Sequence, residues 1–238
     1  MDQRASPKPT GRRIPLPGIG WCKLQQRLAR LAGLLAAVAF AGCAKQLRVA
    51  VPSVEVTPAA PIRPVAATLW VDPQITQAEA STQFQYATVG LIRVFVPYGP
   101  DLTQTIRRAA LSSFATVHEG ETCSQGSQLL IRVEWAGAPT VFVTWDSGFQ
   151  EGARGHVEFP LRLAAVDCGG RLLVRRNVVG TYAGPGAPAG AWNVPGADDF
   201  APIVSAALRD TANKLATAFA SVPIPDAPVA RKATDEGG

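Results

Sequence analysis

The feature that most constrains this chain is an uncharged apolar segment near its N-terminus. Leu31 to Phe40, LAGLLAAVAF, follows the basic stretch KLQQRLAR and precedes Ala41-Gly42-Cys43. A basic region, an apolar region and small residues in this order are typical of a secretory signal peptide. The apolar run is shorter than the roughly 20 residues that a membrane-spanning helix needs. We therefore expect residues 1–42 to be a signal peptide that is removed, with the fold formed by the rest of the chain.

The positive charge of the chain lies in this same segment. The whole sequence has 23 basic and 18 acidic residues, and residues 1–42 hold seven basic residues against one acid, which leaves 16 basic and 17 acidic residues beyond them. A domain with that balance has no electrostatic footprint for phosphate backbones, so we expect no nucleic-acid partner. The Pro-, Arg- and Gly-rich residues 1–20 are unusual in a signal peptide, and a start codon assigned too far upstream explains them.

The cleavage region offers two alternatives. Ala41-Gly42-Cys43 resembles the lipobox of bacterial lipoproteins, whose cysteine takes a thioether-linked diacylglycerol and becomes the first residue of the mature chain, acylated with a fatty acid such as palmitate. The rival A-x-A site, Ala39-Phe40-Ala41, predicts a soluble periplasmic protein that starts at Gly42 and has a free thiol. Cysteine arithmetic favours lipidation of Cys43, because the mature chain then holds an even pair, Cys123 and Cys168. We expect this pair to form a disulfide in an oxidising compartment.

The mature chain divides into three parts by composition. Residues 43–64 begin with the lipidated cysteine and contain several prolines, which predicts an extended tether. Residues 223–238 lack apolar periodicity and are predicted to be a disordered tail. The folded periplasmic domain is then expected over residues 65–222.

Within residues 65–222, short apolar and β-branched runs alternate with two helical patterns. A Pro160-containing run reads as an edge or bulged strand, and Asp167-Cys168-Gly169-Gly170 predicts a hairpin turn after it. The fold class predicted from this order is α+β, a mostly antiparallel sheet with two amphipathic helices packed on one face. The expected strands are 66–72, 88–96, 128–136, 140–145, 156–167 and 171–182, and the expected helices are 102–117 and a C-terminal helix after Asp198 or Asp199 that runs to Val222.

The lipobox, the strand in APIRPVAATLWVDPQ, the helix before Cys123 and the closing helix PIVSAALRDTANKLATAF together resemble the YajG-like outer-membrane lipoproteins. Lipopolysaccharide-assembly and transporter-auxiliary lipoproteins are similar in architecture. The resemblance implies a location more than an activity. Ala44, rather than Asp, follows the lipidated cysteine, which by this resemblance favours the outer membrane.

Residues that carry chemistry are few. The sequence has no nucleophile elbow, phosphate-binding loop, dinucleotide fingerprint or H-E-x-x-H in the mature chain. A zinc site from His118, His156 and the two cysteines lacks ligand spacing, and we expect no metal or cofactor. Trp192, in a Gly- and Pro-rich loop, is the best candidate for contact with a partner or membrane surface. The carboxylates weighed for glycoside hydrolysis are Glu134, Asp146, Glu151, Glu158 and Asp167. The other aromatic residues are weighed as a binding patch with Trp192, but core packing is the default expectation because Trp135 and Trp145 share parity with core-facing neighbours. These residues are Trp135, Phe142, Trp145 and Phe149.

We therefore expect a lipid-anchored envelope lipoprotein that is not an enzyme. Its periplasmic domain is expected to bind an envelope protein or a lipid or glycan component. The alternative is an auxiliary lipoprotein subunit of a transport or export complex. A cell-wall hydrolase, which needs two carboxyl groups that face one cleft, is the less favoured third hypothesis.

Overall fold

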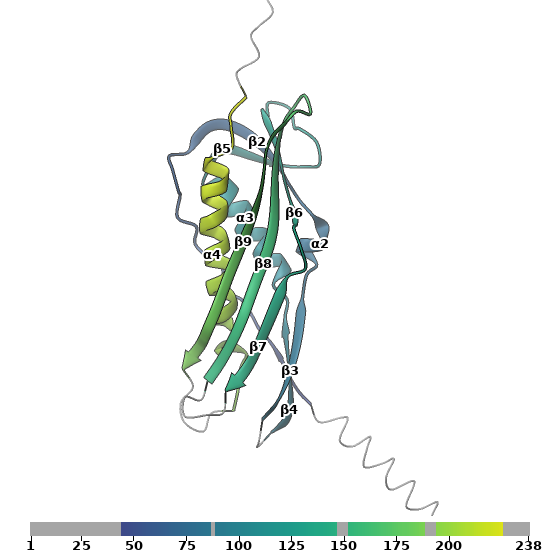
Figure 1. The fold of residues 1–238 in the computed structure, drawn as a ribbon, viewed down its shortest axis with the longest axis vertical. Coiled ribbons are helices and arrows are strands. Elements are labelled where there is room, and N and C mark those ends of the chain that lie inside the picture. The colour runs from purple at the N-terminus through teal and green to yellow at the C-terminus, as the bar shows by residue number, and fades with distance from the viewer. Residues whose placement is uncertain (1–43, 87–88, 147–151, 189–193, 226–238) are drawn as a thin grey trace, which may run out of the picture. The chain divides into compact units, whose positions relative to one another are not determined.

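The computed structural model describes residues 44–86, 89–146, 152–188 and 194–225. The predicted signal peptide and the predicted lipid on Cys43 lie outside these residues, as does the predicted tail beyond residue 225. The described part contains two sheets and two long helices, α3 (Gly99–Leu111) and α4 (Ala201–Ala220), as Figure 1 shows. Among the described helices, none is long and apolar enough to cross a membrane.

The larger sheet has six strands within the described residues, and its pairing is mixed. β2 (Arg63–Val71) lies between β5 (Phe114–Glu119) and β6 (Leu129–Trp135) and runs parallel to both. β6 pairs antiparallel with β8, which also pairs with β7 and β9. These three strands are β7 (Thr140–Asp146), β8 (Gly152–Asp167) and β9 (Leu172–Pro188).

β8 is the strand on which this sheet is organised. Its second half pairs with β6 and its first half with β7, while β9 runs antiparallel along its other edge. Pro160 lies between the two halves, where its carbonyl oxygen accepts a hydrogen bond from Ala136 N at 2.8 Å. Proline has no N–H to donate, and no strand hydrogen bond is lost here because Pro160 lies between the part of β8 that pairs with β7 and the part that pairs with β6. The prediction that Pro160 marks an edge or bulged position is therefore wrong, because β8 is internal and its register shifts against β9 lie at Gly152/Arg154 and Ala165/Val166.

The predicted hairpin between residues 156–167 and 171–182 is confirmed as the β8–β9 pair, and Gly170 in its turn has a φ of +87°. β9 extends further than predicted, to Pro188, into the Gly- and Pro-rich segment that we expected to be a loop. A Cβ at Gly180 would collide with the Thr211 side chain of α4. Glycine in this strand therefore serves the close approach of the helix rather than a turn.

α4 is the predicted C-terminal helix, and it packs against β9, β8 and α3. Pro202 lies in its first turn, where the missing N–H leaves no helical hydrogen bond unmade. The predicted Asp198 or Asp199 cap is not formed. Asp199 Oδ2 instead accepts from Gly196 N at 2.7 Å in the short helix η1 (Ala197–Asp199) before α4.

The first predicted helix is shorter than expected. α3 ends at Leu111, and the hydroxyls of Ser112 and Ser113 both donate to the Ala109 oxygen at 2.9 Å. The aromatic and β-branched residues that follow favour extended backbone, and they form β5. α3 contacts α4, β5 and β2. The finer prediction of two helices side by side on one face of a single sheet is not confirmed, and the described strands form two sheets.

A second, three-stranded sheet involves the segment predicted to be a tether. β1 (Lys45–Arg48) pairs parallel with β4 (Gly90–Val96), which pairs antiparallel with β3 (Ala80–Tyr86). Val49 and Val54, which follow β1, are buried. Extended backbone suits a strand as well as a linker, and the valines of this segment provide the apolar surface that packs. The tether prediction is corrected accordingly: the domain includes residues from Lys45 onward.

A single hydrophobic core runs through the described part of the chain and draws on both sheets and both long helices. Its fully buried aromatic side chains include Phe114, Phe159, Phe200 and Phe219. A one-turn helix, α2 (Pro73–Thr76), begins after Asp72, whose Oδ1 accepts from Gln74 N. The coarse prediction, a mixed α/β domain made mostly of sheet, is confirmed.

Candidate functional site

Cys123 and Cys168 form the predicted disulfide. Their Cα atoms are 5.7 Å apart, and the bridge ties the loop between β5 and β6 to the turn between β8 and β9. The buried hydroxyl of Thr68 holds the same loop by donating to Ser127 Oγ and accepting from Ser124 N, both at 2.9 Å. The bridge is therefore part of a well-connected end of the domain, and it uses both cysteines of the described residues.

The histidines do not join the cysteines. His118 lies on β5, and His156 lies on β8 with its Nε2 3.4 Å from Glu158 Oε1. Because both sulfurs are bonded to each other, the alternative of a zinc site made from these four residues is wrong. Over the described ranges, no group of three His, Cys, Asp or Glu side chains is placed to hold a metal ion.

The described carboxylates among those considered for glycoside hydrolysis lie beside arginine or histidine side chains. Glu134 meets Arg162 across β6 and β8 at 3.4 Å, and Asp146 meets Arg154 across β7 and β8 at 3.1 Å. Both pairs are partly exposed cross-strand contacts, whereas a glycosidase needs two carboxyl groups that face a common cleft. Of the remaining three, Glu158 faces His156, Asp167 faces Arg171, and Glu151 lies outside the described residues.

Asp167 is engaged by the turn that carries Cys168. Its Oδ1 accepts hydrogen bonds from Arg171 N at 2.8 Å and Gly169 N at 3.0 Å, and its Oδ2 accepts from Arg171 Nε at 3.0 Å. These contacts lower the pKa of the carboxyl below its ordinary value of 3.8, and the hydrogen bond from the Arg171 backbone N–H has the largest effect. Its role is to hold the turn.

The predicted partner-contact residue, Trp192, lies outside the described residues, as does Phe149. The core expectation is confirmed for Trp145, which is buried with its ring centroid 6.1 Å from that of Tyr86 and 6.4 Å from that of Phe200. Trp135 packs against the core while partly exposed. Phe142 on β7 departs from the expectation, since 52% of it is exposed.

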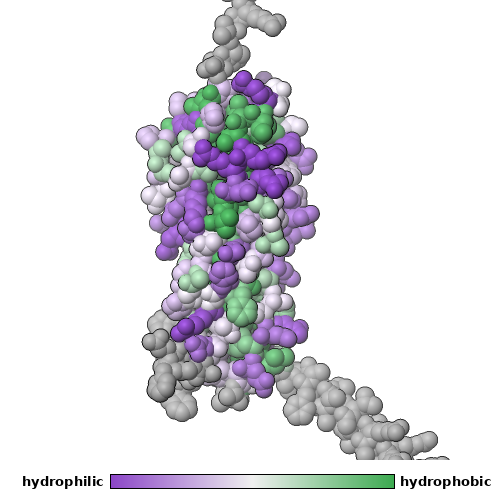
Figure 2. All heavy atoms as spheres, viewed as in Figure 1, coloured by the Kyte–Doolittle hydropathy of each residue, from purple (hydrophilic) through white to green (hydrophobic). Residues whose placement is uncertain are grey.

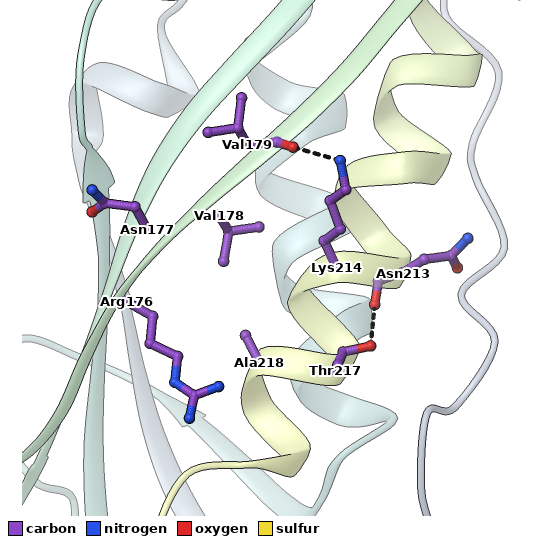
Figure 3. Close-up of a pocket in the computed structure, with 8 residues that line it drawn as sticks. All are labelled: Arg176, Asn177, Val178, Val179, Asn213, Lys214, Thr217 and Ala218. Atoms are coloured by element: carbon purple, nitrogen blue, oxygen red, sulfur yellow. Dashed lines mark hydrogen bonds between the residues drawn. The ribbon is translucent and has the colours of Figure 1, made fainter.

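The described surface is hollowed between β9 and α4, where a groove of about 520 Å³ follows the last turns of the helix (Figure 3). Its apolar floor is made by the buried side chains of Val178 and Ala218. Hydrophilic side chains surround apolar ones over the upper part of this face (Figure 2). The exposed side chains of the groove are Arg176, Asn177 and Val179 on β9 and Asn213, Lys214 and Thr217 on α4.

β9 is an edge strand, because its ladder partner is β8 alone among the described strands. Every second residue of such a strand turns its backbone N–H and C=O away from the sheet. α4 closes part of this edge: Lys214 Nζ donates to the Val179 oxygen at 2.9 Å, and Asp210 Oδ2 accepts from Thr181 N at 2.8 Å. By the same alternation the Asn177 backbone faces this edge. No described side chain reaches the Asn177 backbone, so the strand edge is open beside the groove.

Positive charge that no described acid neutralises lies at the same place. Lys214 is paired with Asp210 at 2.7 Å, but Arg176, which lines the groove, makes no ion pair with any described residue. In Figure 3 the Arg176 side chain points toward the end of α4 at Ala218. A groove with backbone donors and acceptors, a small apolar floor and an unpaired guanidinium group suits an extended anionic segment.

Sequence patterns did not single out this groove. Arg175-Arg176 stands out as a basic pair, and Asp210 and Lys214 fall on the polar side of the last helix. The basic pair and the helix residues come together because the register of β9 places Val179 and Thr181 opposite α4. No local sequence pattern predicts that register.

No family model matches this chain, and no curated protein matches it. A solved structure that is similar is protein XCC0632 from Xanthomonas campestris, of the family DUF330, with 14% sequence identity and a TM-score of 0.38. The match covers 74% of this chain and 91% of that chain. A similarity of this size is too low to assign the chain to that family, and the YajG-like family is not named by it.

Proposed function

We propose that this chain is a lipid-anchored lipoprotein of the bacterial envelope whose domain binds an envelope protein or a lipid or glycan component and carries out no reaction itself. Cys43 bears the lipid. The domain faces the periplasm from the outer membrane, and it needs neither metal nor cofactor. A protein of this kind acts by holding its partner at the membrane.

The observation that carries this proposal is the Cys123–Cys168 disulfide. Disulfides persist in the periplasm and are rare in the reducing cytosol. Because these two cysteines bond to each other, a mature chain that begins at residue 43 has one cysteine left, and it stands directly after the small residues of the cleavage region. Acylation accounts for that cysteine, whereas cleavage before Gly42 leaves it as a free thiol in an oxidising space.

A binding role without chemistry is supported by the placement of the carboxylates. Glu134, Asp146 and Asp167 each form an ion pair with an arginine, whereas a glycosidase needs two carboxyl groups that face one cleft. The open edge beside the β9–α4 groove favours a protein partner over a glycan. Because a subunit of a transport or export complex also binds protein partners, the alternative role as such an auxiliary subunit is the second candidate.

Intact-mass spectrometry of the membrane fraction tests the anchor, with the wild-type chain compared with Cys43→Ser. The proposal expects a mature chain that starts at Cys43 and carries diacylglyceryl and acyl mass, and it expects that mass to disappear in Cys43→Ser. A wild-type chain that starts at Gly42 without lipid contradicts the proposal and makes the protein a soluble periplasmic binding domain.

The two candidate roles differ in what remains bound after mild solubilisation. Pull-down of the lipidated protein with a stoichiometric transporter or secretion protein favours the auxiliary-subunit role. Recovery of abundant envelope protein, lipid or glycan alone favours the general binding role.

A further inference from the structure

We propose that the groove between β9 and α4 takes an extended, carboxylate-bearing segment of a partner protein, which adds a strand to β9 at Asn177 and places an acidic side chain against Arg176. This inference deepens the proposed function, since it rests on the domain binding an envelope protein and names the chemistry of the contact. Two neighbouring features carry it: an open strand edge at Asn177 and, beside it, Arg176, which forms no ion pair with a described acid.

The first step is the strand edge. β9 pairs with β8 on one side, and on the other side α4 satisfies the Val179 oxygen and the Thr181 N–H through Lys214 and Asp210. Between these contacts and the disulfide end, the outward N–H and C=O of Asn177 have no hydrogen-bond partner among the described residues. An added strand supplies its hydrogen bonds to such an edge from its main chain.

The second step is the shape of the site. The groove holds about 520 Å³ between the strand and the helix, and its floor at Val178 and Ala218 is apolar and small. An extended backbone with alternate side chains fits this arrangement, because one side chain in two points into the groove while the next points away. Thr217 does not compete for the ligand, since its hydroxyl already donates to the Asn213 oxygen at 3.0 Å (Figure 3).

The third step is the charge. Arg176, which lines the groove, makes no ion pair with a described residue, whereas Lys214 on the opposite wall is paired with Asp210. Charged side chains at an edge also discourage unwanted strand pairing, so arginines alone do not distinguish a binding site from a protected edge. The two explanations differ in selectivity: a protected edge repels all strands, whereas a binding site accepts an acidic strand and rejects a basic one.

The test titrates the purified full-length lipoprotein in detergent with three labelled peptides and follows fluorescence anisotropy. The first peptide alternates valine and glutamate, the second alternates valine and lysine, and the third is the acidic peptide with alternate backbone nitrogens methylated so that it cannot pair as a strand. The proposal expects binding of the first alone. It also expects amide hydrogen exchange at Asn177 and Val179 to slow when that peptide is bound, since both amides gain partners.

Two variants locate the contact. Arg176→Glu is expected to weaken binding of the acidic peptide by about tenfold or more, because charge repulsion replaces a charge-assisted hydrogen bond. Arg93→Glu, the same charge change on β4 of the other sheet, is expected to leave binding unchanged. The peptide comparison on the wild-type protein decides between the two explanations even if a variant folds poorly.

Equal binding of all three peptides, or binding of none, overturns the proposal. If the protein shows no peptide selectivity but co-sediments with phosphatidylglycerol vesicles, and Arg176→Glu abolishes this co-sedimentation, the partner is an anionic lipid surface rather than a protein. Light scattering that shows a dimer broken by Asn177→Pro replaces it by a second copy of this chain. None of these results bears on the mass of the lipid at Cys43, so failure of this proposal and failure of the proposed function are told apart.

Discussion

At the scale of single residues, Gly180 sets how closely α4 lies on β9. A Cβ at this position would meet the Thr211 side chain, so a methyl group must push the helix away or displace the threonine. We expect Gly180→Ala to lower the free energy of unfolding by about 1–3 kcal/mol, as overpacking does, in urea titrations. Gly137→Ala is the matched control: its added Cβ lies 3.9 Å from the nearest atom, on Pro160, and a change within about 0.5 kcal/mol is expected. Equal losses in both variants would show that the helix does not lie as described.

Asp167 gives a pH-dependent prediction. Its folded-state pKa is lowered, first by the Arg171 backbone hydrogen bond, so its charged form stabilises the folded state. That contribution is complete above the ordinary carboxyl pKa of 3.8 and is lost as the pH falls through the lower pKa of the folded state. We expect wild type to be more stable than Asp167→Ala at neutral pH and the difference to shrink in acid. Urea titrations of both proteins across this pH range measure it, and a difference that grows in acid contradicts the assignment.

Which single residues were predictable depends on whether their role is local. The cysteine pair follows from counting, and the burial of Trp145 follows from its place in an alternating strand. The roles of Asn177 and Lys214 depend on a helix and a strand that are distant in sequence and meet at one register. No periodicity within either segment carries that information.

At the scale of elements, the disulfide joins two loops at one end of the larger sheet. Cys123 and Cys168 are separated by 45 positions, and closing a loop of that length stabilises the folded chain by about 4 kcal/mol if the effect is loss of unfolded-chain entropy. We expect the Cys123→Ser, Cys168→Ser double variant to lose stability of this order in urea titrations. Reductant is expected to lower the wild-type midpoint and to leave the double variant unchanged. A wild-type midpoint that does not respond to reductant, with the bridge shown to be reduced, contradicts the prediction.

The elements that sequence patterns found are those with one clear apolar face. β6, with alternating buried Leu129, Ile131 and Val133, is an example. β3, with the sequence ASTQFQY, is not among the predicted strands, although its half-buried Ala80, Thr82, Phe84 and Tyr86 alternate with exposed Ser81, Gln83 and Gln85. β1 has four residues and is a strand because β4 is available to pair with it, so its existence depends on a contact far along the chain. Strands that form only by pairing with a distant segment are therefore not predicted by local sequence patterns.

At the scale of the whole domain, β1 decides which end faces the membrane if the lipid is on Cys43. Ala44 directly follows that cysteine, and Lys45 pairs with Ile92 near the start of β4, beside the β3–β4 hairpin. The disulfide turn lies at the opposite end of the domain in Figure 1. A strand of 16 residues such as β8 spans about 50 Å, which is the scale of the separation. The groove between β9 and α4, which lies in the first half of β9 near the disulfide turn, is then held away from the lipid surface.

This orientation is testable with a fluorescent amino acid at one of two exposed leucines in lipoprotein-bearing liposomes. Leu91 is 41% exposed on β4, and Leu172 is 52% exposed at the start of β9. Spin-labelled lipid headgroups are expected to quench the fluorophore at position 91 and to leave the one at position 172 bright. The reverse pattern would place the disulfide end at the membrane.

The parallel pairing of β2 has a consequence for how the chain matures. Both neighbours of β2, β5 and β6, come later in the sequence, so if the chain is exported as proposed, β2 emerges with neither edge covered. An unpaired apolar strand is a template for aggregation until its partners arrive. In the exported chain proposed above, β2 therefore stays uncovered until β5 has crossed and gains its second neighbour only with β6, and in that interval the nascent chain is expected to bind periplasmic chaperones.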